Sequence, residues 1–223
     1  TAGLRYVLFD SGWYGPESAE DSDPTTVARA NLDLPEIVRY GKMKGVGVIL
    51  YVNRRPAEKL RDVIFPLYEK WGVAGVKLGF VNVGPQADTA WIAETIRKAA
   101  EHHLLLNIHD GYRPTGLTRT WPNLLTVEGV RGNEHFPTAE HNCTLPFTRY
   151  LAGFADYTVC YYSPRLKNTT HAHQLAMAVV SFSPLQSVFW YDKPADYHDE
   201  PEIEFFQHVP SVCTPDTTRR VVS

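Results

Sequence analysis

The residues best suited to chemistry lie close together between positions 109 and 134. His109 and Asp110 end one apolar run, Glu128 ends the next, and Glu134 follows in the loop after it. If both runs are strands of one parallel sheet, three carboxylates meet at its edge and repel one another. Either one of them stays protonated as a general acid, or a divalent cation lies among them. Oxygen ligands without cysteine favour Ca²⁺ over Zn²⁺.

A second group of candidates lies on two earlier apolar runs. Asp10 closes the first run and is followed by aromatic residues, the first of which is Trp13. A carboxylate beside exposed rings suits a sugar, which offers hydroxyls to the acid and C–H faces to the ring; capping a turn is the alternative role for Asp10. Lys77 lies within another apolar run, and a buried lysine needs a carboxylate partner. We therefore expect these three residues to line the same site.

The elements that position these residues alternate along the chain. Continuous apolar runs predict parallel strands covered on both faces. These runs are Leu4–Asp10, Gly45–Asn53, Gly75–Phe80, Leu104–His109, Asn123–Glu128, Tyr157–Tyr162 and Ser187–Asp192. Helical periodicity between the runs predicts helices. They are Pro35–Lys44, Pro56–Trp71, Gln86–His103 and His171–Phe182.

This alternation predicts an α/β fold with a parallel sheet. Polar residues at the carboxyl ends of the runs favour a (β/α)8 TIM barrel that lacks one strand, because such barrels carry their chemistry at that face. A doubly wound sheet is the alternative, but it usually needs a glycine-rich phosphate loop after its first strand. The loop that starts at Ser11 is aromatic and has no such motif. We assign residues 1–210 to the barrel and 211–223 to an atypical C-terminal tail.

Composition narrows the possible functions. The 223 residues carry a formal net charge of −3, which opposes a general role in binding nucleic acid. Apolar runs such as Val46–Val52 are far shorter than the roughly 20 residues that span a bilayer. The sequence starts at Thr1, shows no signal peptide and is within a predicted strand by Leu4, which suggests an internal piece of a longer protein.

The sequence resembles glycoside hydrolase family 97 in several blocks that occur in the family's order. These blocks are Tyr6–Tyr14, Gly75–Phe80, His109–Gly116, Arg119–Asn123, Glu128–Glu134, Leu145–Arg149 and Asp156–Thr158. The resemblance implies a calcium-dependent, exo-acting α-glucosidase or α-galactosidase that is secreted or periplasmic and acts on α-linked oligosaccharides. It also implies N- and C-terminal β domains and a first barrel strand, and we expect all of these to lie outside this chain.

The resemblance also implies a mechanism. Retaining members carry Lys-x-Asp where this sequence has Lys77 and Gly79, and that Asp is their nucleophile. Because Gly79 has no side chain to attack carbon, the resemblance favours the inverting type, with Glu134 as general acid and Asp110 as general base. The residues that it assigns to Ca²⁺ are Asp110, Glu128 and Glu134. The residues that we expect to bind the sugar are His109, Lys77, Asp10 and Trp13.

Three departures from the family keep other functions open. No acid follows the strand that ends at Asn53, Gly111 stands where similar sequences have an acid, and the segment 211–220 is unlike the family. A non-catalytic carbohydrate-binding barrel or a decayed fragment is therefore the alternative to an inverting α-glucosidase. Within enzymes, the alternative is an α-galactosidase.

Overall fold

The computed structural model describes residues 3–17, 19, 22–161, 168–198, 200–209 and 220–222. Within them, seven parallel strands form one sheet in the order β5-β4-β3-β2-β1-β7-β6. The strands are β1 (Tyr6–Phe9), β2 (Gly47–Asn53), β3 (Gly75–Gly79), β4 (Leu105–Ile108), β5 (Leu124–Val127), β6 (Gln186–Val188) and β7 (Arg220–Val222). The predicted α/β fold with a parallel sheet is confirmed.

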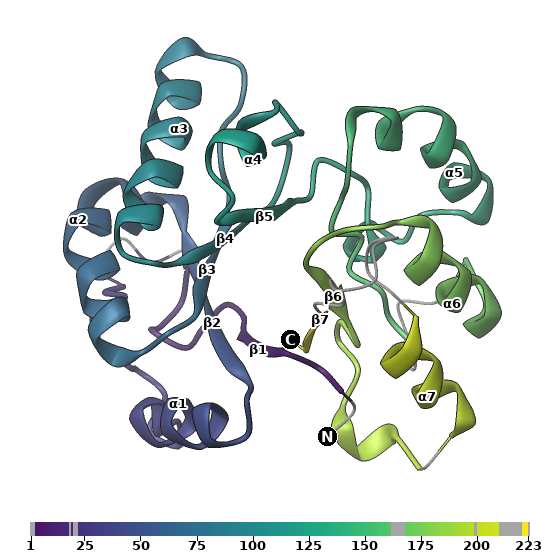
Figure 1. The fold of residues 1–223 in the computed structure, drawn as a ribbon, viewed down its shortest axis with the longest axis horizontal. Helices are drawn as coiled ribbons and strands as arrows, with labels where there is room; N and C mark the ends of the chain where they lie inside the picture. Colours follow the sequence, from purple (N-terminus) through teal and green to yellow (C-terminus); the bar gives the residue numbers. More distant parts are fainter. Residues whose placement is uncertain are drawn as a thin grey trace.

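Helices cover the outer side of this sheet (Figure 1). They are α1 (Leu34–Met43), α2 (Arg54–Trp71), α3 (Gln86–Glu101), α4 (Leu117–Thr120), α5 (Ala139–Thr144), α6 (His171–Val180) and α7 (Pro201–His208), with short 3-10 turns η1 (Asn133–His135), η2 (Leu145–Phe147), η3 (Arg149–Ala152) and η4 (Pro194–Asp196). The four predicted helices correspond to α1, α2, α3 and α6. Among the described residues, none of the helices has both the length and the apolar character needed to cross a membrane.

The junction between β2 and α2 shows how the sequence sets these boundaries. Asn53 ends β2 and caps α2, since its side chain accepts a hydrogen bond from the Arg55 amide at 3.0 Å. The helix ends at Gly72, whose φ of +79° lies in the left-handed region that favours glycine. Strand and helix therefore join without a loop, at the carboxyl edge of the sheet.

An irregular segment connects the two outer strands of the sheet. The Asp156 amide donates to the last carbonyl of β5 at 3.0 Å, and Val159 forms a parallel bridge with β6. The predicted strand Tyr157–Tyr162 is present only as this bridge, and Tyr162 lies outside the described residues. The side chain of Asp156 therefore enters the structure between β5 and β6.

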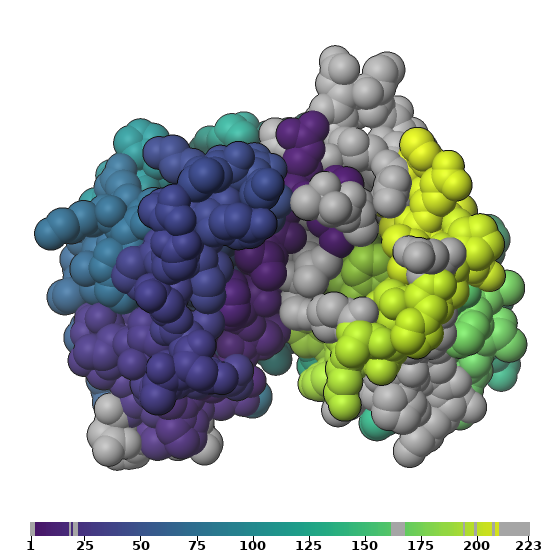
Figure 2. All heavy atoms as spheres, turned by 90° about the horizontal axis from the view of Figure 1, so that it is seen from below, coloured from purple at the N-terminus to yellow at the C-terminus, as the bar shows by residue number. Residues whose placement is uncertain are grey.

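The first strand has a neighbour on each side. β1 pairs with β2 and also with β7, through Tyr6 opposite Val221 and Val7 opposite Val222. Figure 2 shows the N-terminal segment, in purple, between the half of the molecule that carries α1 and the half that carries α7. The predicted lack of a strand beside β1 is not confirmed. Of the predicted tail 211–223, only residues 220–222 are described, and they form β7.

Candidate active site

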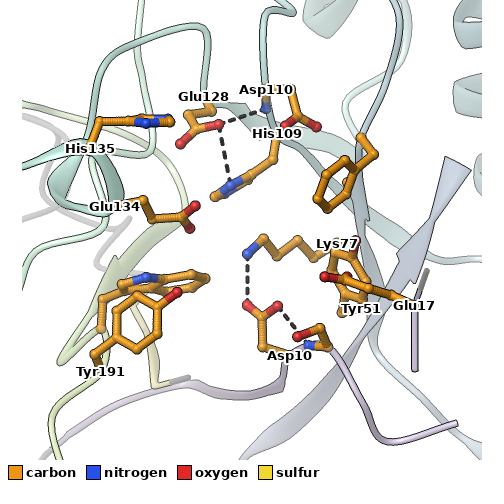
Figure 3. A pocket seen from close by; sticks show the side chains of 14 residues that line it. Asp10, Glu17, Tyr51, Lys77, His109, Asp110, Glu128, Glu134, His135 and Tyr191 are labelled. Atoms are coloured by element: carbon orange, nitrogen blue, oxygen red, sulfur yellow. Dashed lines mark hydrogen bonds and ion pairs between the residues drawn. The ribbon is translucent and has the colours of Figure 1, made fainter. Parts of the chain in front are cut away.

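Because the strands are parallel, their carboxyl ends meet at one edge, and a cavity of about 490 Å³ opens there (Figure 3). That volume lies within the range of small-molecule sites. Of the residues predicted from the sequence, those that line the cavity are Asp10, Lys77, Gly79, His109, Asp110, Glu128 and Glu134. The predicted site residues thus come together, with one exception.

The exception is Trp13. Its side chain is buried, and its indole Nε1 donates to the Tyr51 carbonyl at 2.7 Å. Its ring packs edge-on against Tyr14 and Tyr68. The prediction that Trp13 forms a sugar-binding platform is wrong, because this indole belongs to the hydrophobic core.

Lys77 was expected to need a carboxylate partner, and the structure shows that this partner is Asp10. Lys77 Nζ lies 2.7 Å from Asp10 Oδ2 and 3.9 Å from the ring centroid of Trp190. The other oxygen of Asp10 accepts from the Ser11 amide at 2.7 Å. The buried ammonium group is therefore held by a carboxylate and a ring face, and both oxygens of Asp10 are engaged.

Two carboxylates and a histidine form a polar cluster at the cavity that could hold a metal ion. One ligand atom from each of His109, Glu128 and Glu134 lies within 4.8 Å of the other two. Asp110 is not a member of this cluster: its backbone has a φ of +65°, and its carboxylate accepts from the Val81 amide at 3.1 Å. The structure thus brings together two of the three carboxylates predicted to meet, and places His109 beside them.

Burial controls the charges in this cluster. Burial, together with the nearby Glu134 carboxylate, raises the pKa of Glu128 to about 7 against the opposing effect of the His109 charge. The pKa of His109 is raised although burial lowers it, because Glu128 and Asp156 attract the imidazolium. Burial alone would raise the pKa of Asp156, but hydrogen bonds from His109 and Ser187 lower it to about 2.

Asp156 is a site residue that the sequence analysis missed. Its buried carboxylate accepts from Asn107 Nδ2 at 2.8 Å, His109 Nε2 at 3.0 Å, and the amide and hydroxyl of Ser187 at 2.8 and 2.7 Å. These bonds hold the imidazole so that its Nδ1 lies 3.5 Å from Glu128 Oε2. The sequence feature that could have identified Asp156 is the family-like block Asp156–Thr158, which begins with this residue.

Glu17 also lines the cavity and was also missed. The feature that could have identified it is the presence of an acidic residue in the loop after β1.

Tyr51 occupies the space in front of Gly79. A Cβ atom added at Gly79 would lie 2.8 Å from the Tyr51 hydroxyl oxygen and closer still to its ring. Contacts this short do not occur between real atoms of this kind, so the ring would have to move. The end of β3 therefore offers a backbone surface to the cavity and no functional group.

The raised pKa of Glu128 predicts how metal-free protein responds to pH. The folded protein keeps a proton on Glu128 up to about pH 7, whereas the unfolded chain loses it near 4.5. The contribution of this pKa difference to the free energy of unfolding, at most about 3 kcal/mol, is fully present below pH 4.5 and is lost as the pH rises through 7. Urea unfolding with a chelator present, from pH 5 to 8, should show this loss. Glu128→Gln should remove that part of the pH dependence; an unchanged profile would contradict the raised pKa.

Comparison with known proteins identifies the family. The sequence model described as Glycoside hydrolase 97 matches residues 1–130. The chain belongs to glycoside hydrolase family 97. It is 36% identical to a probable retaining alpha-galactosidase of Streptomyces bingchenggensis, over 83% of this chain and 30% of that protein. It is 32% identical to a retaining alpha-galactosidase of Bacteroides thetaiotaomicron, over 94% of this chain and 34% of that protein.

A solved family 97 structure has the same fold. The enzyme from Pseudoalteromonas sp. strain K8, in complex with panose, superposes with a TM-score of 0.78 at 29% identity. The match covers 94% of this chain and 38% of that one. This chain therefore spans about a third of the length of the family 97 relatives that it matches.

These relatives correct the predicted mechanism. The prediction of an inverting α-glucosidase is wrong, because both curated relatives are named as retaining alpha-galactosidases. The physical reason is that Gly79 excludes only one residue as a nucleophile and does not fix the stereochemistry of a family 97 enzyme. The predicted role of Asp110 as general base belonged to the inverting mechanism and is wrong for the same reason. In the structure, the Asp110 carboxylate accepts a hydrogen bond from the Val81 amide.

Proposed function

We propose that the parent protein is an α-galactosidase and that this chain is the (β/α)8 barrel portion that holds its active site. The proposal is carried by the cavity in which Glu134 and Glu128 face the Lys77–Asp10 pair. Two curated relatives with the matching name support the substrate class. A secreted or periplasmic location follows from the family resemblance.

Glu134 is the proposed general acid. It lies on η1, and its carboxylate points into the cavity, below Glu128 and to the left of Lys77 in Figure 3. A carboxylic acid in this place gives its proton to the oxygen of the leaving sugar as the glycosidic bond breaks. His109 and the Lys77–Asp10 pair are positioned to bind hydroxyl groups of the galactosyl residue. Each is held by hydrogen bonds within the protein before substrate arrives.

The same cluster supports a calcium proposal. The oxygen Oε1 of Glu128 is buried and has no hydrogen-bond partner among the described residues, and Glu134 places a second negative charge beside it. Carboxylate oxygens are the ligands that Ca²⁺ prefers, so Glu128 and Glu134 fit this ion, whereas His109 supplies nitrogen and is bonded to Asp156. Bound Ca²⁺ would offset the repulsion between the carboxylates and polarise a sugar oxygen.

One assay on the full-length parent tests both proposals. Aryl α-galactoside and aryl α-glucoside are compared at equal concentration, before and after chelation. We expect faster release from the galactoside, loss of activity with the chelator, and recovery with Ca²⁺. Preference for the glucoside would overturn the substrate class, and activity that persists after the metal is demonstrably removed would overturn the calcium site. Sugar binding without hydrolysis would identify the protein as a carbohydrate-binding barrel.

A further inference from the structure

The cavity contains a carboxylate that the proposed mechanism does not use. Figure 3 shows Glu17 beside Tyr51, on the far side of Lys77 from Glu134. Glu17 comes from the loop that follows β1, whereas Glu134 lies after β5. The two glutamates therefore reach the same cavity from different loops.

The loop that carries Glu17 is fixed to β2. The buried indole of Trp13 donates to the Tyr51 carbonyl at 2.7 Å, and the buried hydroxyl of Tyr14 accepts from the Asn53 amide at 3.1 Å. Glu17 follows three residues after the second attachment. Its carboxylate is thus positioned by the fold and does not require a ligand to order it.

One oxygen of Glu17 has no hydrogen-bond donor among the described residues, whereas both oxygens of the nearby Asp10 have one. Both oxygens of Asp10 are engaged, by Lys77 and by the Ser11 amide. Glu17 Oε2 is shielded from solvent and accepts no hydrogen bond from the described residues. A buried carboxylate oxygen without a donor is unfavourable, and a donor on a ligand removes that cost.

We propose that Glu17 accepts a hydrogen bond from one hydroxyl group of the bound monosaccharide and is a specificity-determining residue of this site. The inference rests on the proposed function, because it takes a sugar as the ligand. Burial and the Glu17 carboxylate raise the pKa of Tyr51 far above its ordinary value, so Tyr51 stays a neutral neighbour. A hydrogen bond to a charged acceptor corresponds to roughly a 10- to 100-fold change in affinity.

The test measures binding, so that it does not depend on turnover. Calorimetry with the full-length parent carrying Glu134→Gln gives Kd for methyl α-galactoside and its 2-, 3-, 4- and 6-deoxy analogues. The same titrations are repeated after Glu17→Gln or Glu17→Ala is added to the Glu134→Gln protein. The control adds Glu36→Ala instead, which alters an exposed glutamate on α1. We expect both Glu17 variants to weaken galactoside binding roughly 10- to 100-fold, with no effect in the control.

One deoxy analogue should be insensitive to the Glu17 variants, because it lacks the hydroxyl that Glu17 binds. An equal loss for all five sugars, or no loss, in variants whose melting temperature is unchanged would overturn the inference. Failure of every sugar to bind would overturn it as well. Glu17-dependent binding by a protein whose unmutated form hydrolyses no α-galactoside would keep the inference and overturn the proposed function instead.

Discussion

Replacing Glu134 by glutamine should lower kcat on α-galactosides with poor leaving groups by about 10²- to 10⁴-fold, the usual contribution of a general acid. The loss on a dinitrophenyl α-galactoside should be much smaller, because that leaving group departs without a proton. Steady-state kinetics of the full-length parent with both substrates measures the difference. Glutamine keeps the shape of the side chain and cannot donate the proton.

The matched control is Glu140→Gln, which alters an exposed glutamate in the first turn of α5. It should leave kcat unchanged on both substrates. Equal losses on the two substrates for Glu134→Gln would exclude the acid role and assign Glu134 to structure or metal binding alone.

Replacing Asp156 by alanine should lower the free energy of unfolding by about 3–5 kcal/mol, because it leaves a buried histidine charge without its partner. Asn107 and Ser187 also lose their acceptor. Asp156→Asn preserves the volume and part of the hydrogen bonding, so it should cost less. Denaturant unfolding of the full-length parent provides the measurement.

Activity should fall further than stability alone explains, since His109 loses the bond that orients its ring. We therefore expect both Asp156 variants to raise KM at temperatures where they are fully folded. A change in stability below about 1 kcal/mol for Asp156→Ala would show that the network is not important for the fold.

Much of this architecture could be predicted from the sequence, because continuous apolar runs mark strands that are buried on both faces. β1 to β5 lie within the predicted runs, and the polar residues that follow β1, β4 and β5 line one cavity. The need of Lys77 for a carboxylate partner followed from the cost of burying an ammonium group, and the structure identifies Asp10 as that partner. Such predictions succeed where one residue's chemistry requires a partner at a fixed place.

The failures concern side-chain direction. Trp13 follows a strand end, as a sugar platform would, but a buried carbonyl lies within reach of its indole. Asp110 has a left-handed backbone and its carboxylate is bonded to the Val81 amide; this conformation is uncommon outside glycine, although aspartate adopts it more often than most residues. Asp156 comes from a segment without regular hydrogen bonding, so periodicity could not place it.

The ring of Tyr51 in front of Gly79 also limits the order in which this site can change during evolution. An aspartate at position 79 collides with that ring, so the substitution is harmful while Tyr51 is present. A smaller residue at position 51 removes the collision, and the Trp13 attachment survives that step because it uses the Tyr51 backbone carbonyl. In a lineage with glycine at position 79, a carboxylate there therefore costs less after a change at position 51 than before it, when the tyrosine ring has to be displaced.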